Sequence, residues 1–96
     1  MDPNELLRIV DAIHRDKNID KEIVFEGIEA ALISAAKKHY GEEVEIVVEI
    51  DRATGSIRGS HDGVAMEIAE IAERIGAQTL KDLTIQKIRK AERDMP

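Results

Sequence analysis

Apolar residues recur with the spacing of an α-helix in two stretches of residues 1–41. Asp2 and Pro3 form a typical helix start, and the first helix is expected to reach about His14. Its apolar side is formed by Leu6, Ile9, Val10 and Ile13. Asp20 is the expected N-cap of a second helix that ends at Gly41. One face of this helix carries an apolar stripe, which Phe25 and Ala36 widen; the stripe consists of Val24, Ile28, Ala31, Leu32 and Ala35. The two helices are predicted to form an antiparallel hairpin.

The period changes from helical to alternating over residues 44–50, which predicts a β-strand with one apolar and one mostly polar face. Residues 51–55 have the composition of a turn, and residues 56–58 are expected to return as a short partner strand. A second turn at 61–63 precedes residues 64–66, which form a weak third strand. Residues 42–66 are therefore predicted to form a small antiparallel sheet of two or three strands that leans on the helices.

The helical period returns at Glu67 and continues to the end of the chain, with Gly76 as either a stop or a kink. The longer part is expected to run from about Ala77 to Asp94, with an apolar side of Leu80, Leu83, Thr84, Ile88, Ala91 and Met95. The predicted fold class is α+β in a single domain, residues 1–96. It consists of a helical hairpin (1–41), a small sheet (42–66) and a helical segment (67–96).

The composition narrows the possible functions. The chain of 96 residues has no cysteine, which removes disulfides, thiolate catalysis and cysteine-based zinc sites, and fits a reducing compartment. No apolar run is long enough to span a bilayer, so no membrane segment is expected. The net charge of −6, concentrated in residues 41–66, should repel nucleic acid from most of the surface. A protein is therefore the first partner to consider.

The sequence contains no recognisable catalytic or cofactor motif. The three histidines, His14, His39 and His61, fall in different predicted elements without the spacing of metal ligands, so structural or solvent-exposed roles are expected for them. No serine or threonine has a plausible histidine partner, and no phosphate loop precedes a helix. We therefore expect no enzyme, no metal, no cofactor and no small-molecule substrate.

Two surface features stand out from this background. Leu7, Phe25 and Ile33 lie outside the simplest apolar stripes of the helical hairpin. They either belong to a broad stripe that the rest of the fold covers or line an exposed surface that accepts a helix from a partner. On the second reading, these three residues are the candidates for a partner contact.

The second feature is the row Arg74, Gln78, Lys81 and Ile85, which one continuous helix would align on a single side. The row is either an ordinary solvated face or a stripe that contacts phosphates. Lys37 and Lys38 would extend the stripe only if the fold brings them near.

Several stretches, taken in order, resemble the N-terminal domain family of NusA, the bacterial transcription elongation and termination factor. They cover most of the chain and comprise residues 5–17, 19–32, 35–41, 44–55, 75–81 and 85–93. The resemblance implies a cytoplasmic, non-enzymatic module, expected to be a monomer, that docks on RNA polymerase near the RNA exit channel. In that family the domain binds the flap-tip helix of the β subunit and promotes pausing and termination.

The resemblance also implies a basic surface that faces the nascent RNA hairpin and binds it weakly. The matching positions are Lys37, Lys38, Arg74 and Lys81. No family motif identifies the flap-tip contact, so Leu7, Phe25 and Ile33 remain a surface hypothesis for it. Whether the C-terminal domain of the polymerase α subunit is a second partner stays open.

The chain departs from the family in two respects. Only a short link joins Arg58 to Met66, where relatives carry a larger body with further strands, and the sequence ends before the S1 and KH domains that follow in relatives. The second point leaves either an excised fragment or an unusual minimal form, and the exposed C-terminal helix expected here favours the fragment. The alternative function is a small structural or oligomerisation module that pairs through its C-terminal helix, which a sizing experiment would distinguish.

Overall fold

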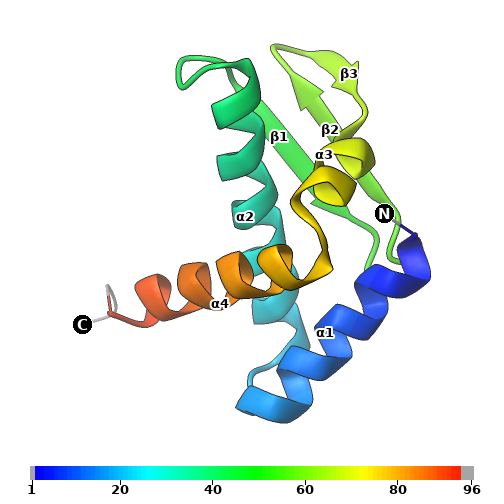
Figure 1. The fold of residues 1–96 in the computed structure, drawn as a ribbon, viewed down its shortest axis with the longest axis vertical. Coiled ribbons are helices and arrows are strands. Elements are labelled where there is room, and N and C mark those ends of the chain that lie inside the picture. The colour runs from blue at the N-terminus through cyan, green and yellow to red at the C-terminus, as the bar shows by residue number, and fades with distance from the viewer. Residues whose placement is uncertain (1, 94–96) are drawn as a thin grey trace.

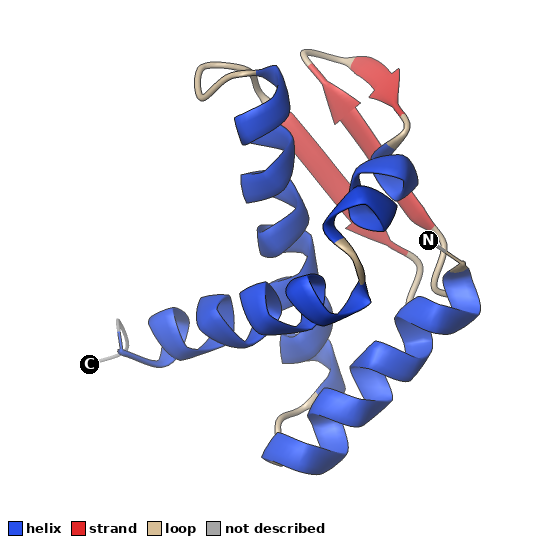
Figure 2. Cartoon of the chain, in the orientation of Figure 1, coloured by secondary structure: helices blue, strands red, loops and turns tan. Residues whose placement is uncertain are grey.

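The computed structural model describes the backbone of residues 2–93 and the side chains up to residue 89. It has four helices and three strands in these residues (Figures 1 and 2). Their order along the chain is α1 (Pro3–Lys17), α2 (Lys21–Tyr40), β1 (Ile46–Ile50), β2 (Ile57–His61), β3 (Val64–Met66), α3 (Ile68–Ile75) and α4 (Ala77–Arg93). The α+β class, the initial helical hairpin and the small antiparallel sheet are confirmed. Asp94 and Met95 lie outside the described residues.

The helices of the hairpin begin and end where capping chemistry allows. The Asp2 side chain accepts a hydrogen bond from a first-turn backbone N–H, and Asp20 does the same for α2. Helix α1 continues to Lys17, one turn beyond the predicted end at His14, because Asn18 closes it in the left-handed conformation, with φ 53°. Gly41 ends α2 with φ 117°. The short link between the two caps reverses the chain (Figure 1).

The three strands form a meander in the order β1-β2-β3, with both pairs antiparallel. Strand β2 runs to His61, beyond the expected residues 56–58, because Asp62 and Gly63 (φ 49° and 82°) turn the chain tightly into β3. Strand β1 shows the predicted alternation, with Ile46, Val48 and Ile50 buried and the residues between them exposed. The register places Val48 opposite Gly59, which lies opposite Met66.

Helix α2 is the centre of the fold, packed on α4, β1, α1 and α3. Its Gly27 permits the close crossing of α4, because a Cβ there would lie 2.8 Å from Ile88 Cγ1. Buried residues from the predicted apolar sides of α1, α2, β1 and α4 form one core, together with Ile68 and Ala72 of α3. The side chain of Ala91 lies outside the described residues. The Cα radius of gyration is 12.7 Å, as expected for a chain of this length. Among the described helices, none is long and apolar enough to cross a membrane.

Gly76 separates two distinct helices. It adopts φ 87° and ends α3, and its backbone N–H donates to the Ala72 carbonyl oxygen. Helix α4 then starts at Ala77 in a new direction, crosses α2 and extends beyond the other elements (Figure 1). The prediction that one continuous helix aligns Arg74 with Lys81 is therefore wrong, since these residues belong to different helices.

Candidate functional site

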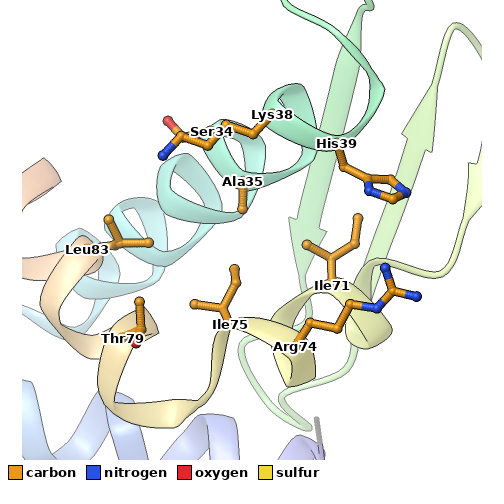
Figure 3. A pocket seen from close by; sticks show the side chains of 9 residues that line it. All are labelled: Ser34, Ala35, Lys38, His39, Ile71, Arg74, Ile75, Thr79 and Leu83. Carbon is orange, nitrogen blue, oxygen red and sulfur yellow. The ribbon is translucent and has the colours of Figure 1, made fainter.

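A groove of about 350 Å³ lies where the C-terminal half of α2 meets α3 and the start of α4. Figure 3 shows the side chains that line it. Helix α2 contributes one wall, α3 the opposite wall and α4 one end, so the groove exists only because Gly76 turns α4 back across α2. The lining residues are Ser34, Ala35, Lys38, His39, Ile71, Arg74, Ile75, Thr79 and Leu83.

The groove combines an apolar floor with a cationic rim. Ala35, Ile71, Ile75 and Leu83 form the floor, and each is half-buried. Lys38 and Arg74 lie on the rim, and both are exposed. Within the described residues, neither forms an ion pair or a side-chain hydrogen bond. Their positive charge is therefore available to a partner.

The structure separates the four predicted basic positions. Lys38 and Arg74 both line the groove, although they are 36 positions apart in the sequence (74 − 38). Lys37 is half-buried and does not line the groove.

Lys81 is two residues from both Thr79 and Leu83, and therefore lies about 200° around α4 from these groove residues. Its ammonium is 3.8 Å from Asp16 of α1. The predicted single stripe of basic residues is corrected to a Lys38–Arg74 pair on one groove and a separate Lys81.

The three apolar candidates also differ in position. Phe25 is 5% exposed, so it belongs to the covered stripe and does not form an exposed surface. Leu7 and Ile33 are half-buried. Leu7 and Phe25 line a small hollow of about 240 Å³ between α1 and the β1–β2 turn, and Ile33 does not. For Phe25 the covered-stripe alternative therefore holds, and the alternative of one exposed surface formed by all three residues is wrong; Leu7 and Ile33 remain half-buried at separate places.

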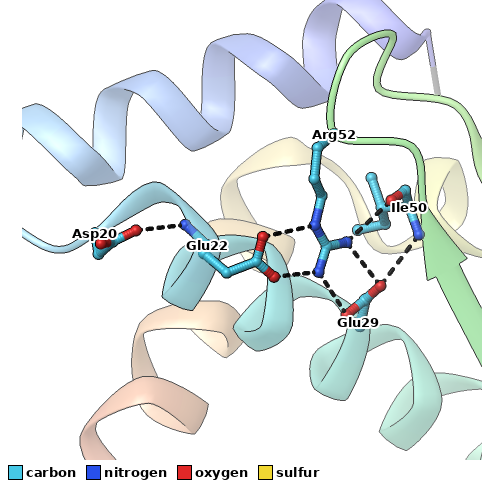
Figure 4. A network of polar contacts seen from close by, with 5 residues as sticks. All are labelled: Asp20, Glu22, Glu29, Ile50 and Arg52. Carbon is cyan, nitrogen blue, oxygen red and sulfur yellow. Dashed lines mark hydrogen bonds and ion pairs between the residues drawn. The ribbon is translucent and has the colours of Figure 1, made fainter.

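Arg52, which no pattern in the sequence indicated, connects the β1–β2 turn to α2 through hydrogen bonds (Figure 4). Its guanidinium donates to Glu22 at 2.6 and 3.1 Å and to Glu29 at 2.9 Å, on the same face of α2. It also donates to the Ile50 carbonyl oxygen at 2.9 Å and lies 4.9 Å from the centre of the Phe25 ring. The spacing of Glu22, Phe25 and Glu29 places them on one helix face and so indicates an acidic site there. Nothing in the sequence indicates that Arg52 is the residue that binds it.

These contacts change the acidity of the groups that make them. Hydrogen bonds from Arg52 lower the pKa of Glu22, and the hydrogen bonds to Glu22 and then Glu29 raise the pKa of Arg52 above its usual value. In the adjoining turn, backbone N–H groups of Ala53 and Thr54 lower the pKa of Asp51. The hydrogen bonds of Asp51 lie within the β1–β2 turn, and those of Arg52 hold this turn against α2. None of these residues lines the groove.

Each of the three histidines contacts neighbouring protein groups, and His39 and His61 share Tyr40 as their partner. The His14 ring nitrogen Nδ1 is 2.6 Å from the Ile19 carbonyl oxygen in the link after α1. The Tyr40 ring stacks on His61 with ring centres 4.6 Å apart, and His39 meets Tyr40 edge-on at 4.8 Å. The described side chains form no group of three or more histidine, aspartate or glutamate residues that could hold a metal ion.

The order of elements defines a small α+β domain in which a helical hairpin precedes a three-stranded meander and two helices follow it. The model of the NusA N-terminal domain family matches residues 5–63, and the chain belongs to this family. The solution structure of the N-terminal domain of NusA from Bacillus subtilis has the same fold, with a TM-score of 0.55 and 33% sequence identity. That comparison covers 95% of this chain and 98% of the Bacillus domain.

The sequences of whole relatives agree with this assignment. The transcription termination/antitermination protein NusA of B. subtilis (strain 168) is 34% identical over 121 residues, which cover 94% of this chain and 33% of that protein. The protein of the same description from Rickettsia conorii is 43% identical over 53 residues, 55% of this chain and 10% of that protein. The chain thus spans about a third of the Bacillus relative.

The comparison with the Bacillus protein also bears on the shortened body. The alignment runs over 121 residues, more than the 96 in this chain, so the Bacillus protein carries residues that have no counterpart here. In this chain the tight turn at Asp62–Gly63 and the three-residue strand β3 connect β2 directly to α3.

Proposed function

We propose that this domain docks on RNA polymerase near the RNA exit channel and promotes pausing and termination without catalysing a reaction. Membership of the NusA N-terminal domain family supports the class of activity, because the relatives are named transcription termination/antitermination proteins. The proposal includes a cytoplasmic location and a monomeric domain that spans residues 1–96.

The Lys38–Arg74 pair is the proposed contact with the nascent RNA hairpin. The observation that carries this assignment is that two exposed cations from distant parts of the sequence meet on one groove without an ion-pair partner among the described residues. Phosphates are bound by such charges without reading bases. Lys37 adjoins the groove in sequence and extends the contact if it reaches the RNA.

The β flap-tip helix is the proposed partner on the polymerase. Leu7 and Ile33 are the members of the predicted apolar set that keep partial exposure, so they are the proposed contacts. Phe25 supports this surface from beneath, because it is buried under Arg52 beside the Leu7 hollow. The C-terminal domain of the α subunit is proposed as a second contact of the docked domain.

The distribution of charge fits this arrangement. A net charge of −6 repels RNA from most of the surface, whereas the Lys38–Arg74 groove admits it in one orientation. Affinity then comes mainly from the polymerase contact, and the phosphates add an increment that falls with rising salt.

The test is a pausing assay with the 96-residue chain, its polymerase and a template that encodes a hairpin-dependent pause. Reversing both charges, Lys38→Glu with Arg74→Glu, is expected to abolish most of the pause enhancement. Each lost phosphate contact should also reduce the slope of log affinity against log salt by about 1. Polymerase binding should stay within about twofold, because the proposed protein contact lies elsewhere.

Lys81→Glu is the matched control, since it reverses one charge on α4 outside the groove and disturbs only a half-exposed pair with Asp16. The Lys81→Glu variant should enhance pausing by the polymerase as much as the unmodified chain does. Unchanged pausing in the double variant would refute the RNA contact. An equal loss in Lys81→Glu would show that the basic surface extends around α4 and is not confined to the groove.

A further inference from the structure

We propose that the groove between α2, α3 and α4 holds the base of one unpaired nucleotide of the transcript, in addition to contacting phosphates. This inference rests on the proposed function, because the same Lys38 and Arg74 are its phosphate contacts. It adds a recognition element, since a groove that holds a base distinguishes unpaired RNA from the paired stem.

The floor of the groove is the first reason. Phosphate contacts need only exposed cations, yet here Lys38 and Arg74 border a hollow with an apolar floor of Ala35, Ile71 and Ile75. Purine and pyrimidine faces are apolar, and proteins hold extruded bases between apolar or aromatic side chains. The volume of about 350 Å³ is at the lower end of the range for small-molecule sites, which suits a single nucleotide.

The rim is the second reason. In Figure 3 the Lys38 side chain extends along α2 toward Ser34, whereas Arg74 reaches toward His39 at the other end of the groove. An RNA strand that crosses the groove would meet a cation on either side of the base that enters it. The exposed His39 ring offers a surface for stacking at this end.

The polar groups of the rim indicate little preference between bases. Ser34 and Thr79 carry hydroxyls, which donate or accept a hydrogen bond as required. Among the described side chains, none of those that line the groove is an amide or a carboxylate that could read the edge of a particular base. The groove is therefore expected to bind an unpaired nucleotide of any sequence.

The experiment compares three RNA ligands by fluorescence anisotropy, using the full 96-residue chain in a low-salt buffer. One is a blunt hairpin, the second carries three unpaired nucleotides beside the stem, and the third carries three abasic nucleotides. The second and third have the same number of phosphates, so their difference reports the base alone. The hairpin with bases is expected to bind about fivefold more tightly than the abasic one.

Two substitutions at one position test whether this gain comes from the groove. Ala35→Leu fills the floor without changing charge and should remove the fivefold difference, leaving the affinity for the blunt hairpin unchanged. Ala35→Ser keeps the floor open and should retain the difference. Circular dichroism and the urea midpoint of each variant show whether it folds, and Leu83→Ala, which enlarges the floor, should also retain binding of the base-containing hairpin.

The outcomes separate this inference from the proposed function. Equal affinity for the base-containing and abasic hairpins, or no effect of Ala35→Leu, would overturn the nucleotide site and leave the phosphate contact standing. Displacement by an acidic amphipathic peptide, with no discrimination between the RNA ligands, would assign the groove to a protein segment. If Lys38→Glu with Arg74→Glu left all three affinities unchanged, the proposed RNA contact itself would fail.

Discussion

Gly55 is the position where a single methyl group should have the largest effect on stability. It lies in the β1–β2 turn with φ 81°, and a Cβ added there would lie 2.4 Å from the Pro3 carbonyl oxygen and 2.9 Å from Leu7 Cγ. The nearest atom is backbone and cannot rotate away. Gly63 provides a matched control in the β2–β3 turn, with φ 82° and nothing within 4 Å of the added Cβ.

Both substitutions place alanine at a positive φ, but only Gly55→Ala also brings the new Cβ into contact with α1. Alanine in the left-handed region costs about 1–2 kcal/mol, partly offset by the reduced freedom of the unfolded chain. Gly63→Ala should therefore lower the free energy of unfolding by about 1 kcal/mol. Gly55→Ala adds overpacking against α1, about 1–3 kcal/mol more. For a domain of this size the additional loss corresponds to a further decrease in Tm of roughly 10 °C.

Urea unfolding, followed by circular dichroism, gives the free energy of unfolding of both variants. An unchanged slope of this free energy against urea concentration would show that the unfolded state is unaffected. The comparison tests the packing of the turn on the first turn of α1. Equal destabilisation by Gly55→Ala and Gly63→Ala would refute that packing, since strain alone would then account for both.

Two further predictions concern the β1–β2 turn. Arg52→Met keeps an apolar stem over Phe25 but leaves Glu29 without its guanidinium, so it should destabilise by about 1–2 kcal/mol in urea unfolding. Lys21→Met, which removes an exposed ion pair, should change stability by less than about 0.5 kcal/mol. Because backbone hydrogen bonds lower the folded-state pKa of Asp51, its stabilisation is present above the unfolded pKa and lost as pH falls through the folded value. Asp51→Asn should therefore flatten the decline in stability below about pH 4, and an unchanged decline would contradict this.

On the proposed function, the basic groove would let a protein of net charge −6 approach RNA. The chain carries more acidic than basic residues, and the cations of Arg52 and Lys81 are paired with carboxylates. Lys38 and Arg74 differ from these two because they make no ion pair among the described residues, and they differ from the other unpaired basic residues because both line the groove. If Lys38 and Arg74 contact the transcript as proposed, this arrangement would limit nonspecific binding and favour one orientation of the domain relative to the RNA.

Local signals were sufficient for the elements and for most of the core. The caps at Asp2, Asp20 and Gly41 depend on the side chain or backbone freedom of single residues, so they can be read without knowing the fold. The alternation of β1 and the apolar stripes of α1 and α2 reflect which side of each element meets the core. The third strand at Val64–Met66 was weakly indicated and is present with the predicted bounds.

The sequence by itself thus determined the order of helices and strands, the faces that pack together and the family, because these follow from nearby residues and their spacing. Only the tertiary structure decided which distant side chains meet. It placed Lys38 and Arg74 on the rim of one groove, paired Lys81 with Asp16 and buried Phe25 under Arg52. These contacts depend on the angle at which α4 crosses α2 after Gly76 and on how the β1–β2 turn folds onto α2. Both are set by packing between elements, which no periodicity along the chain records.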